Sequence, residues 1–324
     1  MFTKLISALK ATRRTIVFTE GPDARILEAA DRLIKDDLMD VILIGNVDEV
    51  KAAAAKGGFD IAKAEIIDPA TYAGMDEMVA KMVELRKGKM SEEDCRKALA
   101  KGNYFGTMLV KMGKADCLLG GATYSTADTV RPALQLIKTK PGNKIVSSCF
   151  IMVRPAASGE NEVLAMADCA INIKPNEDEL VEICKETVSC AKIFGVDPKV
   201  AFLSYSTLGS GKGEDVDKMR NACEKAKALM PDTPIGGEFQ FDAAVSPAVA
   251  KTKHITDAVG GHANTFIFPD INAGNIGYKI AQRLGNFAAY GPILLGLNAP
   301  INDLSRGCNA QEVYSMAIIT AALA

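Results

Sequence analysis

Residues 15–45 read TIVFTEGPDARILEAADRLIKDDLMDVILIG. The two ends of this stretch, Thr15–Phe18 and Val41–Gly45, are short, apolar and bounded by turn residues, which is typical of buried strands. Between them, apolar residues recur at helical spacing on one face, namely at Ile26, Leu27, Ala30, Leu33 and Ile34. This alternation of strand and helix predicts an α/β fold in which helices cover both faces of a mostly parallel sheet.

The same alternation continues through the first half of the chain. We expect helices at Asp76–Lys87, at Glu92–Lys101 behind the capping residue Ser91, and at Ala127–Lys138, with a strand at Asp116–Gly120. Pro141-Gly142-Asn143 is the clearest break in the pattern, because proline and glycine commonly end regular structure. We place a domain boundary there.

The pattern changes after this break. Lys144–Val153 and Glu162–Lys174 are rich in strand-forming residues with little helix between them, which predicts a local antiparallel excursion. Helical periodicity returns at 178–194, where Asn176 and Glu179 have capping-box spacing. Strands are then expected at Ala201–Ser204 and Phe266–Phe268, and helices at Glu214–Met230 and Ala273–Leu284. The residues after Pro300 are too few to form a domain and must pack on a structure already formed.

The composition limits the possible partners. The 324 residues include 38 basic and 40 acidic side chains, so the formal net charge is −2 and no global field attracts nucleic acid or an anionic membrane. No stretch reaches the ~18 apolar residues of a membrane span, and Met1–Arg14 lacks the apolar core of a secretory signal. The eight cysteines form no C-x-x-C pair. We expect buried free thiols in a cytoplasmic protein.

Several familiar catalytic motifs are absent. Leu208–Gly213 resembles a phosphate loop, but Ser206 stands where the Walker pattern needs glycine and Gly213 where it needs Ser or Thr. No dinucleotide fingerprint follows a predicted strand, and no G-x-S-x-G elbow exists. His254 and His262 lack partners at metal-ligand spacing, so we expect no metal site. A Ser–His–Asp triad would require one of them to meet a serine in space, and this alternative stays open.

Three segments carry groups suited to an anionic ligand. The first, Gly120–Pro132, lies between a strand and a helix and offers the hydroxyls of Ser125 and Thr126 and the guanidinium of Arg131. The second, Phe268–Lys279, also joins a strand to a helix and is rich in Asn and Gly. Each also has a structural interpretation: a capped helix start with Arg131 in solvent, and a turn that satisfies its own backbone.

The third segment, Asn302–Asn309, precedes a terminal helix. Arg306, between Ser305 and Gly307, suits close contact with phosphate. Glu312 follows Asn309 at capping-box spacing, so helix capping competes with catalysis as its role.

Longer motifs resemble the phosphate acetyltransferase (phosphotransacetylase) family over nearly the whole chain. They are Tyr104–Met108, Ser125–Leu134, Gly237–Asp242, Phe268–Lys279 and Asn302–Cys308. The resemblance implies reversible acetyl transfer between acetyl phosphate and coenzyme A, with no covalent acyl-enzyme, no required metal and no cofactor, since coenzyme A is a substrate. It also implies a homodimer and two α/β/α domains with mostly parallel sheets flanking a central cleft. The domains are expected at 1–143 with 300–324, and at 144–299.

The resemblance also assigns residue roles. Arg86 and Arg131 would hold phosphates of coenzyme A or substrate, while Ser305 and Arg306 would position acetyl phosphate and stabilise the transition state. Further substrate contacts are expected at Ser125, Thr126, Asn275, Tyr278 and Lys279. The family's catalytic base, seven residues after the serine, is usually aspartate, whereas Glu312 stands there in this chain.

A thiol titrates near pH ~8.5 and a glutamate near ~4.3, so full proton transfer to Glu312 is uphill by roughly 6 kcal/mol. We favour a mechanism in which arginines stabilise the thiolate and the proton leaves as the sulfur attacks. The alternative is a Glu312 carboxyl with an unusually high affinity for the proton. Three alternatives stay open: a butyryl or other short-chain transferase, a non-catalytic binder of acyl-coenzyme A, and, more distantly, a decarboxylating dehydrogenase. The dehydrogenase would need acidic metal ligands and a nicotinamide site, which the sequence does not offer.

Overall fold

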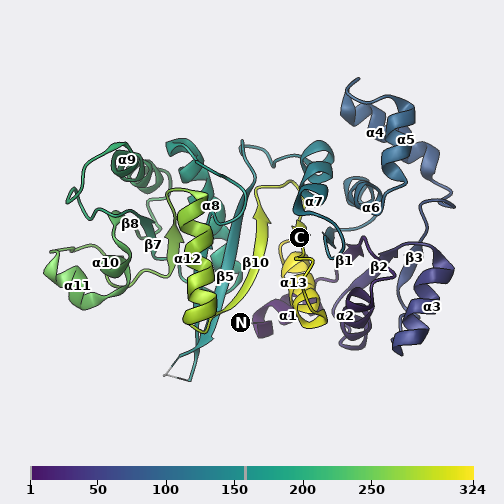
Figure 1. Cartoon of the computed structure of the whole chain (residues 1–324), viewed down its shortest axis with the longest axis horizontal. Helices are drawn as coiled ribbons and strands as arrows, with labels where there is room; N and C mark the ends of the chain where they lie inside the picture. The colour runs from purple at the N-terminus through teal and green to yellow at the C-terminus, as the bar shows by residue number, and fades with distance from the viewer. Residues whose placement is uncertain (1, 157–158) are drawn as a thin grey trace. The chain divides into compact units, whose positions relative to one another are not determined.

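The computed structural model describes residues 2–156 and 159–324. The chain forms two compact units, which we call the terminal unit and the middle unit. The terminal unit comprises Phe2–Pro141 and Leu297–Ala324, and the middle unit comprises Gly142–Gly296. In Figure 1 the terminal unit is coloured from purple to teal and again yellow, because it contains both ends of the described chain.

The sheet of the terminal unit has five strands, and every neighbouring pair is parallel. Their order across the sheet is β11 (Ile301–Asp303), β4 (Cys117–Gly120), β1 (Thr15–Phe18), β2 (Asp40–Ile44) and β3 (Glu65–Ile67). The parallel sheet expected from residues 15–45 is thus confirmed. The three-residue strands β3 and β11 were not recognised in the sequence, because so short a run carries no periodicity.

Helices cover both faces of this sheet (Figure 1). They are α1 (Phe2–Ala11), α2 (Ala24–Lys35), α3 (Val47–Gly57), α4 (Met75–Arg86), α5 (Glu92–Leu99), α6 (Gly102–Lys111), α7 (Thr126–Pro132) and α13 (Ala310–Ala322). Val17 of β1 packs into the core formed with α4, α5 and α6. Its neighbours on β1, Ile16 and Phe18, point to the opposite face because side chains alternate along a strand. The helix α13 packs on α1, α2 and β4.

The single helix expected at Ala127–Lys138 is divided in the structure. The helix α7 ends at Pro132, and Ala133–Ile137 forms a π-turn closed by the bond from Lys138 N to Ala133 O at 2.9 Å. Proline lacks a backbone N–H and disturbs the regular helical bonds before it, which accounts for the change. The helix predicted after Ser91 is confirmed as α5, with both capping-box bonds present.

The sheet of the middle unit has six strands and is mostly parallel. The order is β10 (Ala288–Leu295), β5 (Ser147–Pro155), β6 (Asn161–Ala167), β9 (Thr265–Ile267), β7 (Val200–Leu203) and β8 (Ile235–Phe239). The strands β10, β5 and β6 pair antiparallel and the rest pair parallel. The predicted antiparallel excursion is therefore confirmed, but strand structure ends at Ala167 and does not extend to Lys174. The Asp168 carboxylate accepts the backbone N–H groups of Ala170 and Ile171, which turns the chain.

The helices of the middle unit are α8 (Glu177–Ile193), α9 (Glu214–Leu229), α10 (Phe241–Val245), α11 (Pro247–Thr252) and α12 (Ile271–Leu284). The predicted capping box of Asn176 and Glu179 begins α8. On β5, Phe150 stacks on Tyr278 of α12, while its neighbour Cys149 lies beside Cys190 of α8. Consecutive residues of a strand face opposite sides, so α8 and α12 cover opposite faces of this sheet.

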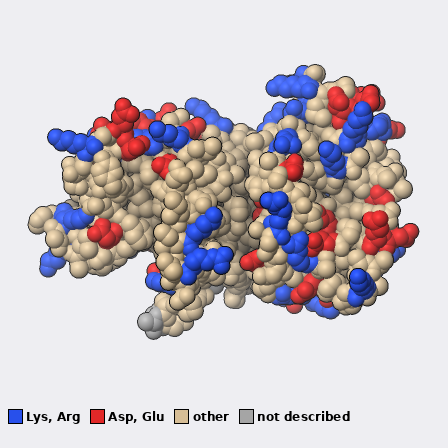
Figure 2. Space-filling view, in the orientation of Figure 1, with Lys and Arg blue, Asp and Glu red and all other residues tan. Residues whose placement is uncertain are grey.

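The distribution of charged side chains and the burial of the cysteines agree with the expectations from the sequence. Figure 2 shows basic and acidic side chains interspersed over the visible face of each unit, with no large area of one sign. All eight cysteines are free and buried, as expected. Within 2–156 and 159–324, no helix is both long enough and apolar enough to cross a bilayer.

Candidate active site

Three loops meet at one edge of the terminal unit's sheet. The strands β1, β4 and β11 are parallel neighbours, so the segments that follow them, 19–23, 121–125 and 304–308, leave the same edge. The chain proceeds from β1 to β2 and β3 on one side, and reaches β4 and β11 on the other. The strand order thus reverses at β1, and in open α/β sheets ligands bind at the carboxyl edge beside such a reversal.

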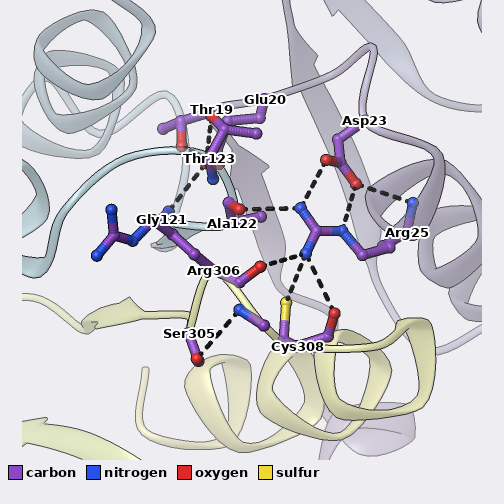
Figure 3. A network of polar contacts seen from close by, with 11 residues as sticks. Thr19, Glu20, Asp23, Arg25, Gly121, Ala122, Thr123, Ser305, Arg306 and Cys308 are labelled. Carbon is purple, nitrogen blue, oxygen red and sulfur yellow. Dashed lines mark hydrogen bonds and ion pairs between the residues drawn. The ribbon is translucent and has the colours of Figure 1, made fainter.

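Glu20 is a buried carboxylate at the centre of this edge (Figure 3). Its Oε1 accepts the backbone N–H of Gly121 at 3.1 Å and of Thr123 at 2.9 Å, and its Oε2 accepts the Thr19 hydroxyl at 2.8 Å. Burial raises the pKa of Glu20, and these donors offset part of the rise. The carboxylate thereby fixes the loop after β4 to the loop after β1.

Asp303, at the end of β11, holds the other side of the same loop. Its two carboxylate oxygens accept the hydroxyls of Thr126 and Thr129, each at 2.6 Å. Burial raises the pKa of Asp303, and these two hydroxyls oppose that rise. Gly121 lies beside it with φ of +99°, and a Cβ there would stand 2.2 Å from Asp303 Oδ1. Only glycine lets the two loops approach so closely.

The hydroxyls expected to bind phosphate already donate to carboxylates. Thr126 donates to Asp303, and Ser125 donates to Asp128 at 2.7 Å. Ser125 is the N-cap residue of α7, but its side chain makes no capping bond to the backbone. These contacts shape the loop, so donation from either hydroxyl to a substrate phosphate requires an exchange of partners.

Arg86 and Arg131 lie near the same phenol group. Burial raises the pKa of Tyr104, while the positive charges of Arg131 and Arg86 both lower it, so both guanidinium groups lie within electrostatic reach of this side chain. Arg131 is half exposed and approaches Asp128 at 3.3 Å. The Nε of Arg86 is buried and, in the part of the chain that the structure describes, has no hydrogen-bond partner.

The loop Ser305–Cys308 presents its polar side chains to solvent. Ser305, Arg306 and Gly307 are exposed, and Cys308 is buried. No residue within the described ranges hydrogen-bonds or ion-pairs with the Arg306 guanidinium, which in Figure 3 extends away from Arg25. Burial raises the pKa of the Cys308 thiol, so this cysteine is not activated as a nucleophile.

Glu312 forms a capping box at the start of α13. Its Oε2 accepts the Asn309 N–H at 3.1 Å, and Asn309 Oδ1 accepts the Glu312 N–H at 2.9 Å. The structural interpretation of the Asn309–Glu312 spacing is therefore confirmed. Because the carboxylate is exposed and three of its lone-pair positions stay available, capping does not prevent a chemical role.

The other three residues assigned to substrate lie on α12 of the middle unit. Asn275 donates to the Cys169 carbonyl oxygen at 3.0 Å, and the Tyr278 ring stacks on Phe150 with centroids 3.9 Å apart. Lys279 is exposed. Asn275 and Tyr278 thus have structural contacts within their own unit.

The sequence analysis gave no role to four polar residues of the terminal unit, namely Glu20, Asp303, Tyr104 and Arg25, although Tyr104 and Asp303 lie within its quoted motifs. A signal existed for the two carboxylates, because each follows or ends a strand whose carboxyl end lies at the ligand-binding edge. Arg25 gave no signal, since its partners at Ala122, Arg306 and Cys308 are remote in sequence.

An edge of this kind, with arginines and hydroxyls beside a strand-order reversal, is typical of α/β proteins that bind phosphorylated ligands. A model of the phosphate acetyl/butaryl transferase family matches residues 1–321. The chain is 54% identical over 309 residues to a phosphate acetyltransferase of Bacillus subtilis, covering 95% of this chain and 94% of the relative. A Staphylococcus epidermidis phosphate acetyltransferase is 51% identical over 314 residues, with the same shares covered.

Among solved structures, a phosphotransacetylase from Streptococcus pyogenes superimposes with a TM-score of 0.95 at 53% identity, covering 99% of this chain and 97% of that one. The chain therefore belongs to the phosphate acetyl/butaryl transferase family of enzymes.

The buried Glu20 generates a pH-dependent prediction for the variant Glu20→Gln. Burial raises the pKa of Glu20 in the folded state above the ~4.3 of a glutamate in an unfolded chain. Wild type therefore loses stability as the pH rises from the unfolded-state pKa through the folded-state pKa. Glutamine does not ionise. We expect the unfolding free energy of the variant relative to wild type to increase between pH 4 and 7, measured by urea titration.

Glu84→Gln is the control of opposite sign. The hydrogen bond from Lys81 lowers the pKa of Glu84. The unfolding free energy of Glu84→Gln relative to wild type should therefore decrease as the pH rises. A stability difference for Glu20→Gln that is independent of pH would contradict the burial argument.

Proposed function

We propose that this chain is a phosphate acetyltransferase that moves an acetyl group between acetyl phosphate and the thiol of coenzyme A. In the forward reaction the C–S bond of acetyl-coenzyme A forms, the C–O bond to phosphate breaks, and the thiol proton leaves the sulfur. The observation that carries this proposal is the 54% identity to the Bacillus subtilis phosphate acetyltransferase along nearly the full length of both chains. The exposed Ser305–Arg306 loop supplies the chemical groups.

Arg306 is proposed to stabilise negative charge on the acyl carbonyl and the departing phosphate. A guanidinium offers five N–H donors in a planar fork, and the fork of Arg306 is not engaged by any described residue. The neighbouring hydroxyl of Ser305 can donate to the same phosphate. Removal of one such donor typically lowers turnover by about 10²–10³.

Arg86 and Arg131 are proposed to bind phosphate groups of coenzyme A. A buried N–H without a partner costs about 1–3 kcal/mol, and an anion placed on Arg86 Nε would relieve that cost. Ser125 and Thr126, at the start of the neighbouring α7, are proposed as further phosphate contacts. In the middle unit we keep Asn275, Tyr278 and Lys279 as proposed substrate contacts, and Lys279 is the exposed cation among them.

Glu312 is proposed to receive the thiol proton. Its exposed carboxylate lies four residues after Cys308, at the beginning of the helix that follows the Ser305–Arg306 loop. Because full transfer from a thiol to a glutamate is uphill by about four pKa units, we propose that proton removal is concerted with attack on the carbonyl carbon. The arginines stabilise the charge that develops on sulfur.

The catalytic prediction concerns Arg306→Ala. We expect kcat for acetyl-coenzyme A formation to fall about 10²–10³-fold, with an unfolding free energy within roughly 0.5 kcal/mol of wild type because the side chain is exposed. The assay mixes protein, coenzyme A and acetyl phosphate and follows thioester absorbance. Arg220→Ala, which removes an exposed arginine of α9, is the matched control.

One outcome tests the role of Arg306, and two others decide between the functions. Near-normal turnover in Arg306→Ala contradicts the assigned role. Faster turnover of butyryl phosphate than acetyl phosphate by wild type favours the longer-chain transferase, and binding of acyl-coenzyme A without turnover favours the non-catalytic binder.

The prediction for Glu312 separates its two roles. Glutamine also serves in a capping box, so Glu312→Gln should keep the melting temperature and lower kcat. Asn309→Ala should do the reverse, losing about 1 kcal/mol of stability while retaining kcat at low temperature. If Glu312→Gln turns over like wild type, the carboxylate is a helix cap alone.

We further propose that the chain forms a homodimer through α12. Ile276, Ile280 and Leu284 recur every four residues on one face of this helix, with 58%, 54% and 81% of their surfaces exposed. A second copy of the chain would cover this apolar stripe. We predict twice the mass of one chain in sedimentation equilibrium at micromolar concentration, and a single-chain mass for Ile280→Glu. A single-chain mass for wild type would refute the dimer.

We also make proposals on the domains of the chain and on its location in the cell. The two compact units are proposed to be the structural domains, with the segment after Pro300 completing the first of them. A cytoplasmic location is proposed from the eight free, buried thiols, which suit a reducing compartment. Periplasmic or secreted enzyme in cell fractions would contradict that location.

A further inference from the structure

Arg25 is the second residue of α2 and hydrogen-bonds to the Ser305–Cys308 loop. Its carboxylate partner is Asp23, the N-cap residue of the same helix, whose Oδ1 also accepts the Arg25 backbone N–H at 2.9 Å. The guanidinium meets both Asp23 oxygens, with Nε to Oδ1 at 3.0 Å and Nη2 to Oδ2 at 2.8 Å. This bidentate pair fixes the plane of the guanidinium relative to the turn between β1 and α2.

The remaining donors of Arg25 reach backbone carbonyls of two other loops (Figure 3). Nη2 donates to Ala122 O at 2.9 Å, and Nη1 donates to Arg306 O at 2.9 Å and to Cys308 O at 3.1 Å. A guanidinium has five N–H groups, and these contacts account for all of them. Arg25 therefore has no donor left for a substrate.

The Ser305–Cys308 loop depends on these bonds for its attachment. Its other hydrogen bonds within the described residues are internal: Cys308 N donates to Ser305 O at 2.9 Å, and Gly307 N donates to Ser305 Oγ at 3.2 Å. The carbonyl of Arg306 is held on Arg25, while the side chain of Arg306 extends in the opposite direction (Figure 3). The orientation of this peptide sets the direction in which the Arg306 side chain leaves the backbone.

We propose that Arg25 is a positioning residue that aims Arg306 at the substrate by holding the carbonyls of Arg306 and Cys308. The inference rests on the proposed catalytic role of Arg306. A displacement of about 1 Å in a reacting group can lower the rate about 10²-fold. Lysine cannot replace Arg25, because an ammonium is a compact group with three donors and cannot span a carboxylate and three carbonyls.

The test is a double-mutant cycle of Arg25→Ala and Arg306→Ala, with Arg25→Lys as the conservative variant. We expect Arg25→Lys and Arg25→Ala to lower kcat about 10- to 100-fold, with less than threefold change in KM for either substrate. In the Arg306→Ala background, Arg25→Ala should lower kcat less than threefold further, because its effect passes through Arg306.

Arg32→Ala is the matched control. Arg32 also belongs to α2 and also contacts the C-terminal segment, donating to Gln311 at 2.9 Å and stacking 4.1 Å from the Tyr314 ring centroid. Within the described chain it forms no hydrogen bond or ion pair with residues 305–308. Loosening α2 from α13 in this way should leave kcat near wild type, although it lowers the melting temperature.

Several results would overturn the inference. The first is a double variant in which the two losses of kcat multiply, and the second is a wild-type kcat in Arg25→Lys. The third is a raised KM with unchanged kcat in either Arg25 variant. The fourth is a loss of kcat in Arg32→Ala as large as that in Arg25→Ala. Failure of the proposed function is distinguishable, because wild type itself would then form no thioester. Unchanged turnover in Arg306→Ala also overturns the inference, while leaving the acetyltransferase activity of wild type intact.

Discussion

The parallel pairing of β11 with β4 is the constraint from which the site follows. Its register places Ile301 beside Leu118 and Asp303 beside Gly120, so the chain leaves β11 at the edge where the loop after β4 begins. A shift of one residue would turn Asp303 to the other face of the sheet. The buried Asn302, which donates to Thr320 of α13 at 2.8 Å, ties the same register to the terminal helix.

Polar groups at this edge divide into two kinds. Glu20, Asp303 and Arg25 are buried or half-buried and fully engaged with backbone groups or hydroxyls of neighbouring loops. Arg306 and the Nε of Arg86 have no such partners among the described residues. The engaged groups fix the geometry of the loops, and the cations without such partners are the ones proposed to bind the ligand. Such preorganisation is what electrostatic stabilisation of a transition state requires.

The sequence predicted the elements whose periodicity is strong. The strand β1 is a short apolar run, and the helix α2 has a clear apolar face. The helix α8 begins with a capping box that is visible in the local sequence. The helix α6 was missed because Phe105–Val110 are all buried, which removes the amphipathic pattern, and two glycines lower its helix propensity. The strand β8 was missed for a related reason, since IGGEF contains two glycines and is wholly buried.

For the candidate site, the family resemblance predicted roles for Arg86, Arg131, Ser305 and Arg306, and the spacing from Asn309 indicated a capping role for Glu312 beside the catalytic one. They could not reveal which hydroxyls are already occupied, because Thr126 meets Asp303 across 177 positions of chain. Arg25 illustrates the same limit, since its bond to Arg306 O spans 281 positions. Local patterns predict which groups are available, but the partners of those groups depend on strand order.

The terminal unit is assembled from two separated stretches, and this has a consequence for biosynthesis. A ribosome completes residues 142–296 before it makes β11 and α13, so until then the chain contains four of the five strands of this sheet and lacks the neighbour of β4 on its β11 side. The Ser305–Cys308 loop is complete only in polypeptides translated beyond residue 308. Products of termination before this point would lack the loop that carries Ser305 and Arg306, and the proposed roles of these residues predict that such products are inactive.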